Sequence, residues 1–437
     1  MNIILLSGGS GKRLWPLSND IRSKQFIRLF KNDMGDYESM VQRVYRQIVS
    51  VDPLAKITLA TSKSQVSAIH NQLGDKVSVC VEPCRRDTFP AIALAASYLY
   101  DVKNVGEQEC VIVCPVDPYV ENAYFEALKK LEDLVHLGEA NLNLMGIQPT
   151  YPSEKYGYII PQNQNEVSRV KEFKEKPDVE TAQRYIEQGA LWNAGVFAFR
   201  LGYLLEKAHS LLNFCDYNDL YKKYEYLEKI SFDYAVVENE TSIQAMRYSG
   251  EWKDVGTWNM MTEVMADHTK GNVILDEQCE NVHVINELEI PILCMGGKNL
   301  IVAASGDGII VSDKERSDYM KPYVEKIQSE VRFAEKSWGT YTVLDAQPGS
   351  MTIKAFLQKG SSMKYHSHTC RSETWTILSG KGKIVLDGME QMVYPGNIVT
   401  IPIGCKHTIF AETDMRLIEV QVGSEISVKD KQVFTLE

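Results

Sequence analysis

The sequence predicts an α/β protein of three parts, because the pattern changes twice along its 437 residues. Short apolar runs alternate with helix-like stretches over residues 1–270, which is typical of a sheet covered by helices. Residues 271–335 hold only short strand-like runs separated by Gly, Asn and Asp. Residues 336–437 hold alternating strands with no long helical run. We therefore expect a helix-covered sheet, a strand-rich bridge with a linker, and a C-terminal all-β barrel.

The N-terminal part has the strand–helix–strand order that produces parallel sheets. The expected strands span residues 3–6, 57–60, 77–81, 110–115 and 142–147, and the expected helices span residues 37–49, 91–100 and 123–136. Because helices connect these strands, we predict a Rossmann-like, mostly parallel sheet with helices on both faces. Ligands of such sheets bind beyond the carboxyl ends of the strands.

The elements after residue 270 are mainly strands. In the bridge they span residues 273–275, 282–285, 291–294, 300–303 and 309–311, which resembles a few coils of a β-solenoid. The charged residues 313–335 are interpreted as a helix or linker. In the barrel, the expected strands span residues 351–357, 374–378, 383–386, 398–401 and 417–422.

Composition excludes several classes of partner. The formal net charge of -11 argues against nucleic acid and anionic membranes as partners. No targeting signal and no apolar run long enough to span a bilayer is found in the sequence. Nine cysteines without a disulfide-framework spacing fit reduced thiols. We therefore expect a cytoplasmic protein that acts on small molecules.

A glycine-rich, basic loop follows the first predicted strand. Gly8, Gly9 and Gly11 leave room for a tightly curved backbone. Arg13 and Lys24 add positive charge close by. Because successive backbone amides in such a turn form a concave anion site, the loop predicts binding of nucleotide phosphates.

Further motifs follow the loop in one order along the chain. They are Lys24-Gln25-Phe26, Glu82-Pro83, Arg85-Arg86-Asp87-Thr88, Asp117, Lys155-Tyr156-Gly157-Tyr158, Phe173-Lys174-Glu175-Lys176-Pro177, Trp192-Asn193-Ala194-Gly195 and residues 252–258 with Asp254. Together they resemble the sugar-phosphate nucleotidyltransferases, and most closely the mannose-1-phosphate guanylyltransferases, over about residues 1–325.

The resemblance implies a reaction in which an oxygen of a sugar 1-phosphate attacks the α-phosphorus of a nucleoside triphosphate and pyrophosphate leaves. It implies a catalytic set of Arg13, Lys24, Asp117 and Asp254, in which Asp117 and Asp254 hold Mg²⁺. The implied nucleotide-binding residues are Ser7, Gly8, Gly9, Gly11, Arg13, Lys24, Glu82 and Arg86. The implied sugar-phosphate-binding residues are Gly157, Glu175, Lys176 and Asn193.

The spacing of histidines in the C-terminal part indicates a second site. The pattern Gly360-x5-His366-x-His368-x4-Glu373-x6-Gly380, followed by Gly396-x5-Pro402-x-Gly404-x2-His407, is the two-part signature of a cupin barrel. Two residues apart on a strand, His366 and His368 point to one face. Glu373 and His407 can complete a ligand set for a divalent transition metal such as Zn, Mn or Fe.

This barrel resembles the mannose-6-phosphate isomerase domain that is fused to bacterial guanylyltransferases. The matching segments are Lys336-Ser337-Trp338-Gly339, Arg371-Ser372-Glu373-Thr374-Trp375 and residues 417–423. The resemblance implies proton transfer between adjacent carbons of an open-chain sugar whose oxygens a metal holds. The family typically has Gln at the position of His366, an extra His where Thr369 and Cys370 stand, and His instead of Thr374. A sugar- or metal-binding accessory domain, or an oligomerisation module, is therefore a competing interpretation, and we expect a homo-oligomer, in its simplest form a dimer.

The sequence leaves the substrates open. GTP and mannose 1-phosphate are the substrates that the resemblance implies, but the family commonly has Asn and Ala where this chain has Asp87 and Phe89. Another base, or another sugar 1-phosphate such as a heptose, is one alternative. A second alternative is a cupin isomerase or epimerase with a nucleotide-binding regulatory domain, and a third is a sugar-nucleotide sensor.

Overall fold

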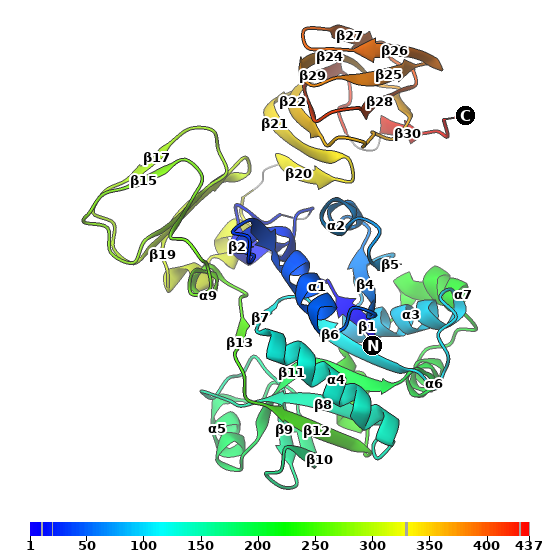
Figure 1. Ribbon diagram of the computed structural model, residues 1–437, viewed down its shortest axis with the longest axis vertical. Helices are drawn as coiled ribbons and strands as arrows, with labels where there is room; N and C mark the ends of the chain where they lie inside the picture. The colour runs from blue at the N-terminus through cyan, green and yellow to red at the C-terminus, as the bar shows by residue number, and fades with distance from the viewer. Residues whose placement is uncertain (10–11, 20, 328–330, 428–429, 437) are drawn as a thin grey trace.

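The computed structural model describes residues 1–9, 12–19, 21–327, 331–427 and 430–436, which form three regions in chain order (Figure 1). A helix-covered sheet occupies the N-terminal region, a narrow arm of strands follows it, and a barrel lies at the C-terminal end.

A nine-stranded sheet forms the centre of the N-terminal region, in the order β5-β4-β1-β6-β11-β8-β12-β10-β9. Its strands are β1 (Asn2–Leu6), β4 (Lys56–Ser62), β5 (Ser78–Glu82), β6 (Cys110–Pro115), β8 (Leu142–Ile147), β9 (Tyr158–Pro161), β10 (Val167–Lys174), β11 (Leu191–Arg200) and β12 (Ile243–Tyr248). Only β10 and β11 run against the other seven strands. The prediction of a mostly parallel sheet in an α/β fold is therefore confirmed.

Helices cover both faces of this sheet because its strands are apolar on both sides. Ile3 and Leu5 pack into one core, and Ile4 packs into the other. The helices are α1 (Met40–Val51), α2 (Val66–Leu73), α3 (Thr88–Asp101), α4 (Asn122–Leu137), α5 (Val179–Glu187), α6 (Leu201–Leu211), α7 (Tyr217–Lys223), α8 (Phe232–Ala235) and α9 (Trp258–Thr262). Side chains of α1, α2 and α4 belong to the first core, and those of α3 and α6 belong to the second.

Short 3-10 turns and strands connect the main strands and helices of the N-terminal region. They are the 3-10 turns η1 (Lys12–Leu14), η2 (Lys24–Phe26), η3 (Tyr224–Tyr226) and η4 (Val237–Asn239), and the strands β2 (Arg28–Lys31), β3 (Tyr37–Ser39), β7 (Pro118–Val120) and β13 (Trp252–Asp254). Residues 37–39, which we expected to be helical, form β3 instead. The helix starts at Met40 because the Ser39 hydroxyl accepts a hydrogen bond from the Gln42 amide, and the Gln42 side chain accepts one from the Ser39 amide.

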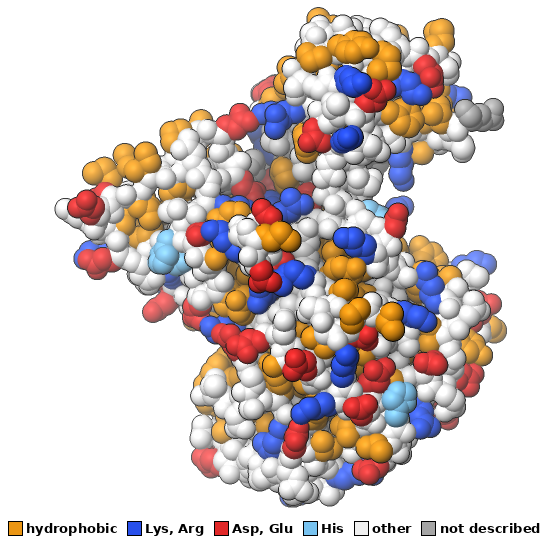
Figure 2. All heavy atoms as spheres, viewed as in Figure 1, with side chains coloured by type: hydrophobic (Ala, Val, Ile, Leu, Met, Phe, Trp, Pro, Cys, Tyr) orange, Lys and Arg blue, Asp and Glu red, His pale blue; other side chains and the backbone are white. Residues whose placement is uncertain are grey.

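The arm consists mainly of stacked parallel strands, as the solenoid interpretation predicts, with β19 antiparallel to β18. Strands β14 (Thr269–Lys270), β16 (His283–Asn286), β18 (Leu300–Ser305) and β19 (Gly308–Asp313) form one sheet, and β15 (Val273–Leu275) pairs in parallel with β17 (Ile292–Cys294). Apolar side chains gather on the outer surface of this arm (Figure 2), among them Ile274 and Leu293, which face each other across β15 and β17. The turn η5 (Arg316–Tyr319) and the helix α10 (Lys321–Val324) follow.

The C-terminal region is an all-β barrel made of two facing sheets. One has the order β20-β21-β22-β29-β24-β27 and the other has the order β26-β25-β28-β23-β30. The strands are β20 (Phe333–Lys336), β21 (Gly339–Gln347), β22 (Ser350–Leu357), β23 (His366–His368), β24 (Arg371–Ser379), β25 (Gly382–Leu386), β26 (Met389–Val393), β27 (Ile398–Ile401), β28 (His407–Ala411), β29 (Met415–Gly423) and β30 (Lys431–Val433). The first of them begins at Phe333, three residues before residue 336, where we placed the domain boundary.

Two general features complete the fold. All nine cysteines are free thiols. Within the described ranges, no helix has both the length and the hydrophobicity that crossing a membrane requires.

Candidate active site

A cavity of about 220 Å³ opens at the carboxyl ends of the parallel strands. Five of the predicted site residues line it, namely Asp117, Gly157, Glu175, Asn193 and Asp254. They come from loops or strands that are far apart in the sequence, and the sheet order brings them together. Lys155, Tyr156, Asp233 and Trp252 line the same cavity.

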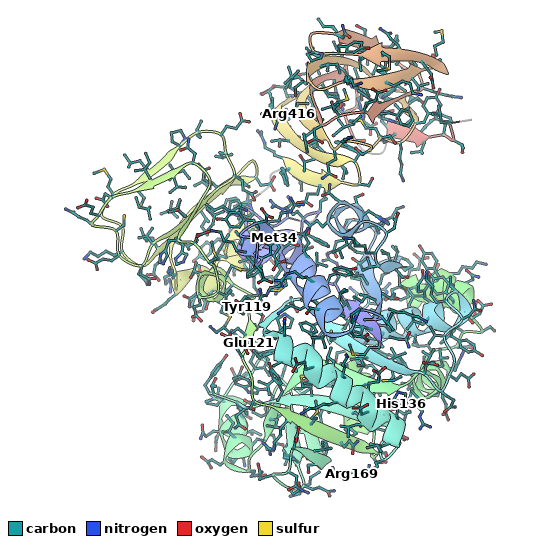
Figure 3. All side chains as sticks on the ribbon, viewed as in Figure 1. Met34, Tyr119, Glu121, His136, Arg169 and Arg416 are labelled. Atoms are coloured by element: carbon teal, nitrogen blue, oxygen red, sulfur yellow. The ribbon has the colours of Figure 1, made fainter. Side chains whose placement is uncertain are left out.

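The ribbon of β7 and β13 brings the two predicted magnesium ligands together. Asp254 pairs with Pro118, which directly follows Asp117. Tyr119 and Glu121, labelled in Figure 3, mark where this ribbon leads into α4. Two carboxylates at one position in a pocket suit a hard divalent cation that also binds phosphate oxygens.

Lys24 is the cation nearest to this acidic pair. Its Nζ lies 2.8 Å from Oδ2 of Asp117. Burial alone would lower the pKa of Lys24, but the charges of Asp117 and Asp254 outweigh it and raise the pKa. Burial and the neighbouring carboxylate of Asp117 raise the pKa of Asp254, against the opposing charges of Lys24 and Arg13. Burial also opposes ionisation of Asp117, yet Lys24 holds its pKa below the usual value. Lys24 therefore stays protonated, and Asp117 beside it stays ionised.

The glycine loop follows β1 on the same side of the sheet. Gly9 has a φ of +117°, and a Cβ placed on Gly8 or Gly9 would meet nothing within 4 Å, so the backbone faces open space. Gly11 lies outside the described residues. Arg13 of η1 is exposed, and its guanidinium comes close enough to Asp254 to oppose the rise of that group's pKa.

Ser7 is placed differently from the other loop residues. Its side chain is fully buried and accepts a hydrogen bond from Gln25 Nε2 at 3.1 Å. Gln65 Nε2 in turn donates to Ser23 Oγ at 2.7 Å, and Ser23 Oγ donates to the Gly9 carbonyl at 3.1 Å. Sequence reasoning missed Ser23 and Gln65, which fasten the loop to the segment that carries Lys24.

Glu82 and Arg86 lie outside the residues that line this cavity. Glu82, at the end of β5, is buried and accepts a hydrogen bond from Tyr224 Oη at 2.7 Å, and burial raises its pKa. Arg86 donates to the carbonyls of Tyr224 and Glu225. Both residues therefore fix η3 against the strand end.

The two departures near Arg86 have structural explanations. Asp87 has a φ of +70° and caps α3, because its Oδ1 accepts from the Thr88 amide at 2.7 Å. Asn and Asp both cap helices well. Phe89 is buried and packs against Phe232 with ring centroids 6.4 Å apart.

Three of the four predicted sugar-phosphate-binding residues, Gly157, Glu175 and Asn193, line the cavity, and Lys176 contacts Glu175. Lys176 Nζ donates to Glu175 Oε1 at 2.5 Å. A Cβ on Gly157 would lie 2.5 Å from Glu175 Oε2 and 2.9 Å from Phe173 Cζ, so any other residue there would displace these side chains. Asn193 donates from its amide to Asp233 Oδ1 at 2.6 Å. Burial and the charge of Glu175 raise the pKa of Asp233 to about 7, and its motif Asp233-Tyr234-Ala235-Val236 was the available sequence signal for it.

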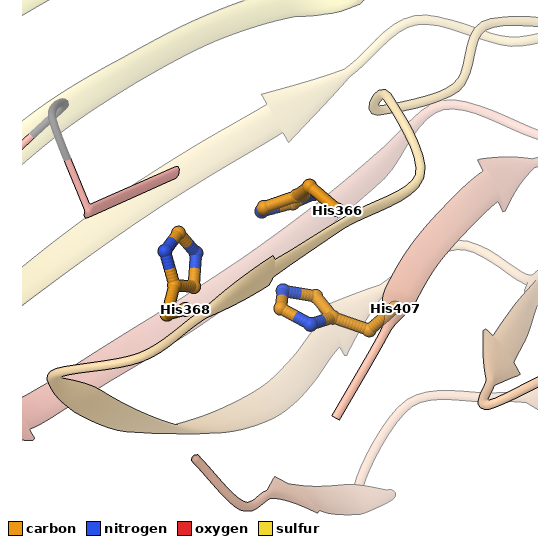
Figure 4. A group of neighbouring side chains, drawn as sticks. All are labelled: His366, His368 and His407. Atoms are coloured by element: carbon orange, nitrogen blue, oxygen red, sulfur yellow. The ribbon is translucent and has the colours of Figure 1, made fainter. Parts of the chain in front are cut away.

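The barrel holds the second predicted cluster. His366 and His368 of β23 and His407 of β28 place one ring nitrogen each within 4.8 Å of one another (Figure 4). Each Nδ1 faces a backbone carbonyl, that of Lys364, Asp430 and Cys405 respectively, at 2.6, 3.1 and 3.0 Å. A carbonyl only accepts, so each Nδ1 carries a proton, and an Nε2 that has no proton offers its lone pair to a metal. Buried Nε2 of His407 makes no hydrogen bond to any described residue. Three such nitrogens fit a divalent transition metal.

Glu373 adjoins these histidines but is already engaged. Its Oε1 lies 3.1 Å from His368 Nε2 and accepts from Arg371 Nε at 3.2 Å. Its Oε2 accepts from Trp375 Nε1 at 3.2 Å and lies 3.4 Å from His407 Nε2. Burial opposes its ionisation, but the two histidines outweigh burial and hold the pKa of Glu373 far below its usual range. Glu373 is thus a carboxylate available to a metal only if these contacts rearrange.

Comparisons with known proteins agree with both domains. Residues 2–271 match the family described as "Nucleotidyl transferase". The chain belongs to this nucleotidyl transferase family. Residues 325–435 match "Mannose-6-phosphate isomerase C-terminal". The predicted resemblance to nucleotidyltransferases with a fused cupin is confirmed.

Relatives of this nucleotidyl transferase cover the whole chain. A mannose-1-phosphate guanylyltransferase of Klebsiella pneumoniae is 27% identical over 98% of this chain and 97% of its own length. The xanthan biosynthesis protein XanB of Xanthomonas campestris is 30% identical over 98% of this chain and 96% of its own. A solved structure from Thermus thermophilus, titled a mannose-1-phosphate geranyltransferase, is 28% identical with a TM-score of 0.60 and covers 75% of this chain and 99% of its own.

Proposed function

We propose that this protein transfers GMP from GTP to mannose 1-phosphate, giving GDP-mannose and pyrophosphate. The observation that carries the proposal is that Asp117, which pairs with Lys24, and Asp254 line the same cavity as Glu175 and Asn193. There a cation can bind the phosphoryl group of a substrate while hydrogen-bonding side chains bind the hydroxyl groups of the same substrate. The names of the full-length relatives support the choice of guanine and mannose.

The chain's own residues supply positioning and charge. Gly8 and Gly9 leave their backbone open to the triphosphate, and Arg13 and Lys24 offset its negative charge. Asp117 and Asp254 would hold Mg²⁺, which neutralises charge on the phosphates when bound. The Glu175 and Asn193 side chains orient the sugar so that its phosphate oxygen lies in line with the bond to pyrophosphate. No protein nucleophile is needed for this displacement.

Pyrophosphate release from the purified protein with Mg²⁺ tests the proposal. Four nucleoside triphosphates, each paired with mannose, glucose and heptose 1-phosphates, separate the alternatives by their kcat/KM. We expect GTP with mannose 1-phosphate to be the best pair. If a different pair gave the highest kcat/KM, the proposed substrates would be wrong. If no pair released pyrophosphate, the proposal of nucleotidyl transfer would be wrong.

Mannose-6-phosphate isomerisation by the barrel is a second candidate, favoured by the three histidines in its interior. A Zn, Mn or Fe ion held by their Nε2 atoms would polarise the sugar oxygens. The test is interconversion of mannose 6-phosphate and fructose 6-phosphate with each added metal, for the wild type and His407→Ala. Activity that His407→Ala keeps would assign it to another site.

Two further expectations are part of this proposal. GTP as substrate favours the cytoplasm, which microscopy of a tagged protein would test. A homodimer is the expected assembly, and light scattering on the eluted protein measures it.

A further inference from the structure

A cavity of about 560 Å³ in the barrel is closed in part by the N-terminal region. Ile21 and Ser67 line it together with barrel residues. Ile21 lies three residues before Lys24, and Ser67 lies in the first turn of α2. The barrel cavity is therefore shared between two regions of the chain.

Cations exceed carboxylates on the wall of this cavity. Lys336, Lys364, Arg371 and Lys431 line it, against Glu373 and Glu419. Arg371 is paired with Glu373. Among the described residues, no carboxylate oxygen lies within 4.0 Å of the Nζ of Lys336 or Lys431. Lys336 Nζ lies 5.3 Å from the centroid of the Tyr341 ring, and the charges of Glu419 and Glu373 act on Lys431. Because cations still outnumber carboxylates on this wall, the cavity fits an anionic group, and the histidines and the amide of Gln421 fit hydroxyls. A sugar phosphate has both.

The strand that carries Lys336 is held by the N-terminal region. Gln72 Nε2 of α2 donates to Glu335 Oε2 at 2.8 Å, and Asn71 Nδ2 donates to the Lys336 carbonyl at 2.9 Å. Asn19 Nδ2 donates to the Phe333 carbonyl at 3.1 Å. β20 thus contacts both α2 and the segment that precedes Lys24.

Arg22 joins the same segment to the arm and the barrel. Its side chain is 5% exposed, its Nη1 lies 2.7 Å from Glu287 Oε2, and its Nε lies 3.8 Å from Glu335 Oε1. The next two residues reach the other site, since Ser23 Oγ donates to the Gly9 carbonyl and Lys24 pairs with Asp117. Ile21 and Arg22 therefore lie within three residues of both Ser23, which contacts the glycine loop, and Lys24, which contacts Asp117.

We propose that the barrel cavity and the nucleotidyltransferase site are energetically coupled through residues 19 and 21–24, so that a sugar phosphate bound in the cavity tightens nucleotide binding. A ligand packed against Ile21 holds this segment in the position that presents Lys24, which the nucleotide also requires. Such coupling is reciprocal, so the nucleotide must tighten the cavity's ligand by the same factor. The inference depends on the proposed function only for the identity of the nucleotide.

Calorimetry on the full-length protein tests the coupling without turnover. Sorbitol 6-phosphate is the probe, because it has no carbonyl group and cannot be isomerised. Its Kd is measured with and without GTP and Mg²⁺, and we expect about a fivefold tighter Kd with the nucleotide. A Kd that the nucleotide leaves unchanged, or no binding of the probe, overturns the inference. Pyrophosphate release in the absence of the probe judges the proposed function separately.

Variants locate the two ends of the coupling. Lys336→Met weakens probe binding at least tenfold, whereas Lys383→Met on the opposite sheet, where Lys383 pairs with Glu390, leaves it unchanged. Ile21→Ala keeps the probe bound but reduces the fivefold effect toward none. Unaltered binding in Lys336→Met, or full coupling in Ile21→Ala at an unchanged Tm, contradicts the proposal.

Discussion

Replacing Lys24 by Met tests the central charge of the nucleotidyltransferase site. The ammonium lies 2.8 Å from Asp117, and the Lys24 side chain is only 17% exposed, so water replaces its charge poorly. Loss of one preorganised charge at a reacting phosphate costs about 10²–10³-fold in kcat, or roughly 3–4 kcal/mol of transition-state stabilisation. Stability changes less, by about 1 kcal/mol, because the Asp117 side chain is 39% exposed, so water partly replaces the lost ammonium.

The assay is pyrophosphate release under saturating substrates, with thermal unfolding measured in parallel. Lys63→Met is the matched control, since Lys63 is exposed in the turn after β4 and outside the cavity. Its kcat should equal that of the wild type. If Lys24→Met retained more than about a tenth of the wild-type kcat at an unchanged Tm, the assignment of Lys24 to the reacting phosphates would be refuted.

Three further predictions concern the sugar pocket and the barrel. Gly157→Ala places a Cβ 2.5 Å from Glu175 Oε2, and we expect it to raise the KM for the sugar phosphate at least tenfold with a smaller effect on the KM for nucleotide; equal effects on both would contradict this role. Asp233→Asn removes a carboxyl whose pKa burial raises to about 7. Because the folded protein keeps this proton to a higher pH than the unfolded chain, the wild type loses stability as the pH rises from about 4 to about 7. The Tm advantage of the variant should therefore grow over that range, and a constant difference in thermal scans would be inconsistent with this. Chelator treatment should lower the Tm of the wild type, with recovery on adding Zn²⁺, but should leave His407→Ala unaffected; an identical response of both proteins would place the metal elsewhere.

Patterns within short stretches of the sequence predicted individual strands and the histidine cluster. The apolar runs at residues 110–115 and 142–147 coincide with β6 and β8. The spacing of His366, His368 and His407 identified three side chains that do converge, because period two fixes one face of a strand and the register pairs His366 with His407. Ser39 and Gln42 also formed a readable cap, which the expectation of a helix from residue 37 overlooked.

The remaining features depend on contacts between distant segments. Nothing in residues 191–200 indicates that β11 inserts antiparallel between β6 and β8, since strand direction is set by the connections and not by composition. Ser7 stands inside the phosphate-loop motif, yet Gln25 and Gln65, distant in sequence, draw its side chain into the interior. The contacts of Glu82 and Arg86 likewise depend on where η3 packs, and no residue spacing near them in the sequence reveals that position.

A strand of the central sheet, β11, forms part of the wall of the proposed sugar pocket. β11 loses its regular register with β8 between Asn193 and Phe197, and Gly195 there has a φ of +69°, so Asn193 turns toward the cavity while the strand continues on both sides. Changing the sugar that is accepted therefore means altering a structural strand and not a replaceable loop. Selection for new sugar substrates should begin from a stabilised parent protein, because substitutions at this irregular part of β11 would lower the free energy of unfolding before they change the sugar specificity.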